Sequence, residues 1–364
     1  MNNTLLSKLT LIIPTFNRQA YALRNMRYWS GREAIMHVFD GSFSAIAAKE
    51  LSGLDDNIYY HHLPISMVER LKRSIDFIST EYTALMCDDE FYIPSALDAC
   101  IRELEVRSDL VSCMGRCIRF NFTKQGITGT IGYPVMENYT ILQNDPIERM
   151  VAHMYPYIPS TIYSVVRSTV WKRSLSTFLQ KEFSAFAIGE LQFELAVCYQ
   201  GKSMVIPKLM WLRSMEGEPI RGNDPSLIPE NTFQKWWNDP AKQQERSEFL
   251  NIMGAILAET VDKIAELSAG VKKALDVYVQ GIDPKLGFTK KIKQIILCFL
   301  PASLQIPLKS ILCAIRKNPL CVEKSIVAVA KDMADTGVYV DFQELSKIES
   351  IVLAFHSNKQ GKQV

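Results

Sequence analysis

The chain has 364 residues, of which 48% are hydrophobic and 22% are charged, and its formal net charge at pH 7 is +2. Glycine and proline contribute 17 and 16 residues, too few for a collagen-like or low-complexity chain, and the hydrophobic content excludes a wholly disordered one. The small net charge also argues against a polycation that binds nucleic acid. A chain of this length has room for two or three domains and a large core.

Short apolar runs alternate with helical patterns in the first part of the chain. We expect strands at 9–14, 34–40, 58–62 and 82–87, with helices at 21–29, 45–53 and 67–79 between them. This alternation is typical of an α/β protein with a mainly parallel sheet. The next helix is expected at 96–106, because Pro94 suits its first turn.

The pattern changes about two thirds of the way along the chain. Strands are expected at 111–122, 126–133 and 203–207, and helices at 145–154, 168–180 and 190–200. A segment rich in Gly, Pro, Asn and Asp follows at 216–230, and beyond it helical periodicity dominates at 241–268, 286–299, 303–317 and 321–335. We therefore predict an α/β domain over residues 1–225 and a helical domain over 226–364.

The predicted helical domain contains a strongly basic segment. Residues 284–322 include seven lysines and arginines and no acid, whereas the rest of the chain has 34 basic and 39 acidic residues. Apolar residues at 286, 288, 292, 295, 296 and 299 fall on one helical face, with Lys290, Lys291 and Lys293 beside or opposite it. Two interpretations stay open: an interfacial helix on an anionic membrane, or a packed helix with solvated lysines.

The cysteines and the N-terminus indicate the compartment. The eight cysteines include no CxxC pair, which favours reduced thiols. Residues 1–11 are too polar for a secretory signal, and the longest apolar run, 295–308, is interrupted by Pro301 and Pro307. We therefore expect a cytoplasmic protein, with the basic segment as a possible contact to the inner face of the membrane.

Polar residues follow three of the predicted strands. Residues 14–18 read Pro-Thr-Phe-Asn-Arg, residues 40–42 read Asp-Gly-Ser, and residues 88–90 read Asp-Asp-Glu. In parallel α/β sheets, ligands bind at the carboxyl ends of strands, so these residues are expected to line one crevice. Taken singly, the second segment is explained by a turn with a left-handed glycine, and the first by a helix cap followed by a solvated arginine.

The three consecutive acids are the most informative of these segments. Asp88, Asp89 and Glu90 repel one another, and a divalent cation such as Mg²⁺ or Mn²⁺ would relieve the repulsion. Alternate residues of an extended turn point the same way, so Asp88 and Glu90 would share a ligand while Asp89 faces elsewhere. The competing interpretation is a solvated acidic turn before the helix that begins near Pro94.

The order of these motifs closely resembles the GT-A, family-2 type glycosyltransferases over residues 9–213. The resemblance is most specific at residues 13–18 and 86–91, and Cys87 to Phe91 together with Ile162 to Arg167 look like a bacterial subgroup of polysaccharide-assembly enzymes. It implies a GT-A fold, a nucleotide-sugar donor, and a glycan or lipid-linked glycan acceptor.

The resemblance also implies roles for single residues. Pro14, Thr15, Asn17 and Arg18 would border the nucleotide, and Asp40 would bind the nucleobase. Arg70, Lys72 or Arg73 would reach the diphosphate. Asp88 and Asp89 would lie at the donor, and Asp88 and Glu90 would hold Mn²⁺ or Mg²⁺. Glu90 stands where the family more often has Asp, which changes the geometry offered to a metal.

An inverting transferase also needs a general base for the acceptor hydroxyl. Family members often carry an acid at the start of a late helix that ends in glycine, and Glu190, with Gly201 after the helix, matches that spacing. Gly189 stands where the family usually has another acid. Glu194 is the alternative base, and the simpler interpretation of Glu190 is an acid that complements the helix dipole.

The sequence thus favours a metal-assisted, inverting glycosyltransferase of bacterial surface polysaccharide synthesis. The competing hypothesis is a non-catalytic scaffold whose helical part recruits partners to the membrane. A nucleotidyltransferase is disfavoured, because residues 14–18 do not form the Gly-rich phosphate loop that such enzymes need.

Overall fold

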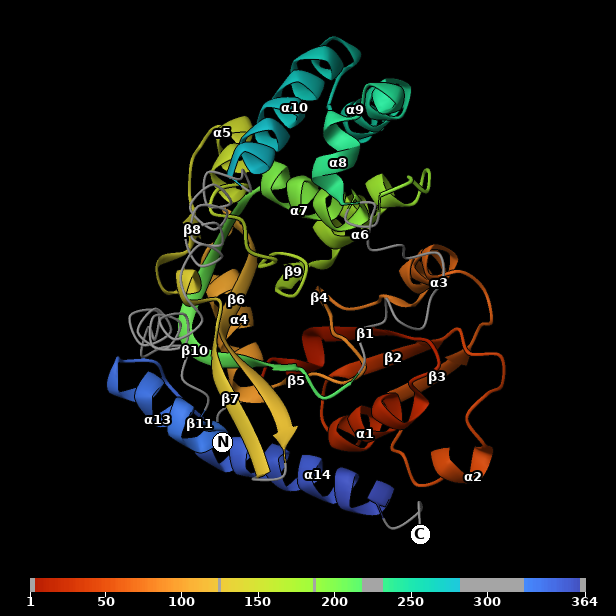
Figure 1. Ribbon diagram of the computed structural model, residues 1–364, viewed down its shortest axis with the longest axis vertical. Helices are drawn as coiled ribbons and strands as arrows, with labels where there is room; N and C mark the ends of the chain where they lie inside the picture. Colours follow the sequence, from red (N-terminus) through yellow and green to blue (C-terminus); the bar gives the residue numbers. More distant parts are fainter. Residues whose placement is uncertain (1–3, 124–125, 186–187, 218–231, 282–323, 361–364) are drawn as a thin grey trace, which may run out of the picture.

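A computed structural model of the protein describes residues 4–123, 126–185, 188–217, 232–281 and 324–360. Its mixed α/β architecture, with a mostly parallel central sheet and helices on both faces, confirms the predicted fold class (Figure 1). The sheet path runs β11–β7–β6–β9–β4–β1–β2–β3.

Four strands of the first 90 residues form the wholly parallel half of the sheet. They are β1 (Leu9–Thr15), β2 (Ile35–Asp40), β3 (Ile58–His62) and β4 (Tyr82–Leu85), in the order β3–β2–β1–β4. Thr15 and Asp40 are register partners, so β1 and β2 end at the same level. The apolar side chains of β1 are buried on both faces, as a central parallel strand requires.

The other half of the sheet is built mainly around two long strands. These are β6 (Leu110–Thr123) and β10 (Lys202–Ser214), which run parallel to each other with three register shifts. Strand β9 (Val165–Arg167) is antiparallel to both β4 and β6 and joins the two halves. Strands β5 (Phe91–Tyr92), β7 (Gly126–Gly132), β8 (Thr140–Ile141) and β11 (Lys324–Ser325) complete it. Strand β10 is longer than the strand predicted at 203–207, and it therefore includes Trp211.

Helices cover the two faces of the sheet. One face shares a hydrophobic core with α1 (Gln19–Trp29), α4 (Pro94–Val106), α13 (Ile326–Asp335) and α14 (Phe342–Gln360). The other packs against α3 (Met67–Ser74), α6 (Ser168–Phe178) and α7 (Ile188–Gln200). The short α2 (Ala48–Leu51) and the 3₁₀ turns Leu6–Lys8, Ile75–Phe77, Pro134–Asn138, Pro240–Lys242 and Val261–Lys263 connect these elements.

The helices after residue 231 join two different cores. Helices α8 (Phe233–Asn238), α9 (Gln243–Leu257) and α10 (Ile264–Gly281) pack with α5 (Pro146–His153) and α7, and this cluster contains Trp236 and Trp237. Helices α13 and α14 lie at the opposite end of the molecule, on the sheet (Figure 1). The predicted boundary near residue 225 lies outside the described residues and stays a prediction.

The predicted basic segment, 284–322, also lies outside the described residues. None of the helices that the structure describes has the length and apolar character needed to cross a membrane.

Two histidines in contact on β2 and β3 make the stability of the sheet dependent on pH. Nδ1 of His37 lies 3.0 Å from Nε2 of His61, and burial, followed by the neighbouring His61, lowers the pKa of His37 to about 4 from 6.5. Between these two values the unfolded chain binds more protons than the folded one, so stability falls as the pH falls. We expect a loss of roughly 1–3 kcal/mol across this window in thermal or urea unfolding.

The matched variant is His37→Phe, which keeps a stacked ring and removes one titrating group. Its unfolding free energy should depend less on pH over the same range. An unchanged pH slope would contradict the role of His37.

Candidate functional site

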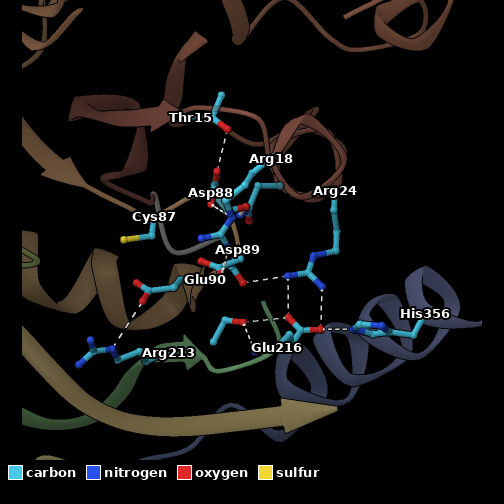
Figure 2. A network of polar contacts seen from close by, with 12 residues as sticks. Thr15, Arg18, Arg24, Cys87, Asp88, Asp89, Glu90, Arg213, Glu216 and His356 are labelled. Atoms are coloured by element: carbon cyan, nitrogen blue, oxygen red, sulfur yellow. Dashed lines mark hydrogen bonds and ion pairs between the residues drawn. The ribbon is translucent and has the colours of Figure 1, made fainter. Parts of the chain in front are cut away.

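The predicted strand ends come together at one edge of the parallel sheet. The Oγ1 of Thr15, at the end of β1, donates a hydrogen bond of 2.7 Å to Oδ2 of Asp88, which follows β4 (Figure 2). Arg18, just before α1, contacts the same acidic turn. Segments that are 70 residues apart in the sequence therefore form one polar cluster, as the strand-end argument predicted.

The acidic turn is buried rather than solvated. Asp88, Asp89 and Glu90 are 1%, 8% and 5% exposed, so the interpretation of this segment as a solvated turn is wrong. Arg18 is also mostly buried, at 10% side-chain exposure, and its Nε lies 3.3 Å from Oδ1 of Asp88 while its Nη2 pairs with Asp89. The expectation that Arg18 is a solvated cation is therefore wrong as well, because it neutralises two buried acids.

The orientation of the three acids differs from the predicted alternation. Asp88 and Asp89 share Arg18, whereas Glu90 points toward β10 (Figure 2). The Nε1 of Trp211 donates a 2.7 Å hydrogen bond to Oε2 of Glu90, and Nε of Arg213 lies 3.8 Å from Oε1. Asp88 and Glu90 were expected to face the same ligand, but the chain turns tightly here and separates them.

Burial perturbs the ionisation of this turn. Burial raises the pKa of Asp88 to about 7, although Arg18 opposes the shift. Burial, followed by the charge of Asp89, raises the pKa of Glu90 to about 8. Carboxyl groups held in this state are costly to the fold and are typical of functional sites.

The present arrangement does not fit a divalent cation held by three carboxylates. In the described part of the chain, no group of three or more His, Cys, Asp and Glu side chains is arranged to hold a metal. Arg18 already lies between Asp88 and Asp89, and Glu90 is bound by Trp211. The predicted Mn²⁺ or Mg²⁺ at Asp88 and Glu90 therefore stays a prediction.

Asp40 is fully buried at the end of β2 and accepts three hydrogen bonds. The donors are Nε2 of Gln19 at 2.5 Å, the hydroxyl of Tyr60 at 2.6 Å and the amide of Ser42 at 2.8 Å. Burial by itself raises the pKa of Asp40, but bonds from Ser42, Tyr60 and Gln19 outweigh it and lower the pKa. Asp40 is thus a fixed, ionised acceptor, and its contact with a nucleobase stays a prediction.

Pro14 lies in β1 opposite Phe39, and Asn17 lies in the turn that follows this strand. Asn17 is exposed, adopts a left-handed backbone with φ of 55°, and donates its amide to Oγ of Ser42 at 2.8 Å. It is not a helix cap, since α1 has Arg18 at its N-cap and no side-chain cap bond. The turn instead ties β1 to β2, and it leaves the Asn17 side chain at the surface of the site.

The three basic candidates on α3 lie in different places. Arg70 is buried and donates to the backbone oxygens of Thr15 and Phe39, so it clamps the ends of β1 and β2. Lys72 and Arg73 are exposed on the same helix. A role of any of the three at a diphosphate stays a prediction, but Arg70 already has a structural role.

The two candidate bases on α7 differ in access. Glu194 is fully buried and accepts from Nε2 of His153 and from the amide of Ile162 at 3.0 Å, which argues against the alternative base. Glu190, one turn earlier, is only partly buried and accepts a hydrogen bond from the hydroxyl of Tyr157. Of the two, Glu190 is the carboxylate that an acceptor can reach.

Tyr163 lies beside the acidic turn, and Glu190 is one of the charges that act on it. The neighbouring Cys87, followed by burial and the charges of Glu90 and Glu190, raises the pKa of Tyr163 well above its ordinary value. The ring therefore lies within electrostatic reach of both carboxylates. Tyr163 itself lies at the acidic turn, because its hydroxyl is 3.9 Å from Sγ of Cys87.

A second buried ion pair lies beside the turn, and no motif in the sequence predicts it. Arg24 of α1 donates to the backbone oxygen of Asp89 at 2.8 Å and pairs with Glu216 at 2.9 Å (Figure 2). Glu216 also contacts Nε2 of His356 on α14 at 2.5 Å. Arg24 and Glu216 meet where α1 packs beside the end of β10, and the packing of α14 adds His356 to the pair.

Comparisons with known proteins give distant structural likenesses. No protein-family profile and no curated protein matches the chain. A solved structure of S. aureus TarS residues 1–349 shares 14% identity over 77% of this chain and 91% of its own, with a TM-score of 0.43. The same protein in complex with UDP-GlcNAc shares 14% identity over 77% of this chain and 92% of its own, with a TM-score of 0.47. Its complex with UDP shares 12% identity over 77% of this chain and 91% of its own, with a TM-score of 0.41. Likenesses at this level equate no residue of this chain with one of TarS.

Gly41 follows Asp40 for a reason that differs from the predicted one. The φ of Gly41 does not lie in the left-handed region. Among the described glycines, only those at 31, 53, 126 and 337 have a left-handed φ. A Cβ at Gly41 would instead lie 2.3 Å from Nη1 of the anchored Arg70. Gly41→Ala should therefore displace Arg70 and destabilise the fold by about 1–3 kcal/mol in urea unfolding.

Ser44→Ala, in the same loop and exposed, is the matched control and should be nearly neutral. Equal stability of the two variants would show that the Arg70 side chain moves aside without cost. It would contradict the role of Arg70 in holding the ends of β1 and β2 together.

Proposed function

We propose that the protein is a glycosyltransferase that moves a sugar from a nucleotide-activated donor to a hydroxyl of a glycan or lipid-linked glycan. The single observation that carries the proposal is the buried acidic turn at the end of β4, beside which lies Tyr163, whose pKa is raised by the neighbouring Cys87 and, among other causes, by the charge of the partly exposed Glu190 on α7. Thr15 and Arg18 contact Asp88 and Asp89 on one side, and Tyr163 lies near both Glu90 and Glu190 on the other. A scaffold gains no stability from buried carboxyls with perturbed pKa values.

In this proposal the donor binds at the ends of β1, β2 and β4. Asp40, ionised and fixed by three donors, is suited to accept a hydrogen bond from a nucleobase in exchange for one of them. Thr15, Asn17 and Arg18 border the nucleotide, and Pro14, partly buried, shapes the turn beneath it. These assignments follow the resemblance of residues 13–18 and 86–91 to family-2 type glycosyltransferases.

The proposed chemistry is a direct displacement with inversion. Glu190 accepts the proton of the acceptor hydroxyl as its oxygen forms a bond to the anomeric carbon, and the bond from that carbon to the donor diphosphate breaks. The nucleoside diphosphate leaves with the electron pair. Holding the two substrates at one site supplies much of the rate, because it replaces a bimolecular encounter. We place this activity in bacterial surface polysaccharide synthesis on the resemblance alone.

The donor screen tests the proposal without knowledge of the acceptor. UDP-, GDP- and CMP-activated sugars are incubated with the full chain, with Mn²⁺ or with EDTA, and release of the nucleotide is measured. We expect slow hydrolysis of one donor class. Asp88→Asn, which can still bond to Thr15, should lower it by about 10²-fold or more. Undiminished hydrolysis by Asp88→Asn would remove the central claim.

The base is tested by Glu190→Gln. It should reduce turnover by roughly 10²–10⁴-fold while nucleotide affinity, measured by calorimetry, is retained. Glu182→Gln, an exposed glutamate of the same region, is the control and should turn over normally. If no nucleotide binds to the wild-type chain under any condition, the scaffold hypothesis is preferred instead.

Tyr157 offers a finer test of how Glu190 is held. Burial, followed by the charges of Glu194 and Glu190, raises the pKa of Tyr157 well above its ordinary value, so its hydroxyl remains a donor to the Glu190 carboxylate. Tyr157→Phe removes that donor and disfavours the charged carboxylate. We expect the acid limb of the pH–rate profile to move to higher pH, with nucleotide affinity unchanged. A lower rate with an unshifted profile would instead indicate loss of packing.

A further inference from the structure

Two arginines of neighbouring strands lie opposite each other on the Glu90 side of the site. Arg119 of β6 and Arg213 of β10 are register partners in the parallel pair, so their side chains leave the same face of the sheet. Their guanidinium carbons lie 4.6 and 5.3 Å from the ring centroid of Tyr133. Like charges directly opposite on paired strands destabilise a sheet, which calls for a compensating anion.

The described acids supply little of that compensation. Arg213 has one acidic neighbour, Glu90 at 3.8 Å, and Glu90 is also bound by Trp211. Among the ion pairs of the described residues, none involves Arg119, and its buried Nε has no hydrogen-bond partner. Contacts with the Tyr133 ring stabilise a guanidinium but do not neutralise its charge. Among the described acids, Glu90 is the one carboxylate within ion-pair distance of either arginine, and it contacts Arg213 alone of the two.

Tyr133, which is within cation–π distance of both arginines, has an unusual backbone. Its φ is 47°, a left-handed value that is strained for a residue with a bulky side chain. Its ring stacks on Trp211 at 5.7 Å, and Trp211 stacks on Tyr163 at 4.7 Å. The aromatic stack therefore runs from the arginine pair to Tyr163, the residue within electrostatic reach of Glu190.

The pair is accessible to a ligand. The Arg213 side chain is 34% exposed, and Arg119, Tyr133 and Tyr163 are partly exposed. Figure 2 shows Arg213 separated from Asp88 and Arg18 by Glu90, so the pair lies apart from the strand ends that we assign to the donor. Guanidinium forks match the oxygens of a phosphate group in geometry as well as charge.

We propose that Arg119 and Arg213 bind a phosphate group carried by the acceptor, with the Tyr133 ring beside its sugar. The protein would thereby select a phosphorylated glycan over a neutral one. That the phosphate belongs to an acceptor rests on the proposed function, whereas the anion site itself rests only on the arginine pair. The other source of the same chemistry is the diphosphate of the donor.

The test uses glucose 6-phosphate, glucose and UDP as probes of the full chain, each titrated calorimetrically at low salt. We expect glucose 6-phosphate to bind and glucose not to bind. Arg119→Gln and Arg213→Gln should each lower the affinity for glucose 6-phosphate by about tenfold and leave the affinity for UDP unchanged. Arg27→Gln, a surface arginine paired with Glu50, is the matched control and should alter neither affinity.

Two results would overturn the proposal. One is glucose 6-phosphate binding that both variants leave intact, or no binding at all. The other is an equal loss of UDP affinity, which would assign the arginines to the donor. Arg213 is exposed enough that its variant should fold even if Arg119→Gln does not, and circular dichroism checks both. Failure of UDP, GDP and CMP alike to bind the wild type would reject the proposed function but not the anion site.

Discussion

The pairing of two guanidinium groups with the acidic turn is the interaction on which the rest of the structure depends. Removing three adjacent carboxyls from water is costly unless each is paired or hydrogen-bonded. Arg18 pairs with the side chains of Asp88 and Asp89, and Arg24 binds the backbone of Asp89. Helix α1 therefore holds both the charges and the path of the turn. Without it, the end of β4 could not be buried.

The same constraint explains why the last helix packs where it does. Arg24 is itself buried and needs a counter-charge, which Glu216 provides, and Glu216 in turn contacts His356 of α14. The Arg24 guanidinium also lies 4.6 Å from the ring centroid of Phe355. Each buried charge thus recruits a partner from farther along the chain. The series ends at His356, whose side chain is 14% exposed and stacks on Phe122.

The sequence predicted the parallel half of the sheet well because its signals are local. Apolar runs that stop at polar residues, with helical patterns between them, were enough to predict β1 to β4 and the gathering of their polar ends at one edge of the sheet. What an arginine or an acid pairs with depends on packing across the whole chain, so the burial of Arg18, the Arg24–Glu216 pair and the direction of Glu90 were missed. The glycine at 41 was attributed to a left-handed turn, but it is required because a side chain there would collide with Arg70.

The divergence of the acidic turn gives the candidate site two electrostatically different sides. Asp88 and Asp89 face Arg18 and the ends of β1 and β2, where charges are matched within ion-pair distance. Glu90 faces β10 and β6, where Arg213 and Arg119 outnumber the acids beside them. On the first side a ligand binds by exchanging existing contacts, as proposed for a nucleobase at Asp40, whereas on the second side an anion offsets the charge of the two arginines. The fold therefore separates a preformed, neutralised cluster from a cationic one, with a single buried carboxyl between them.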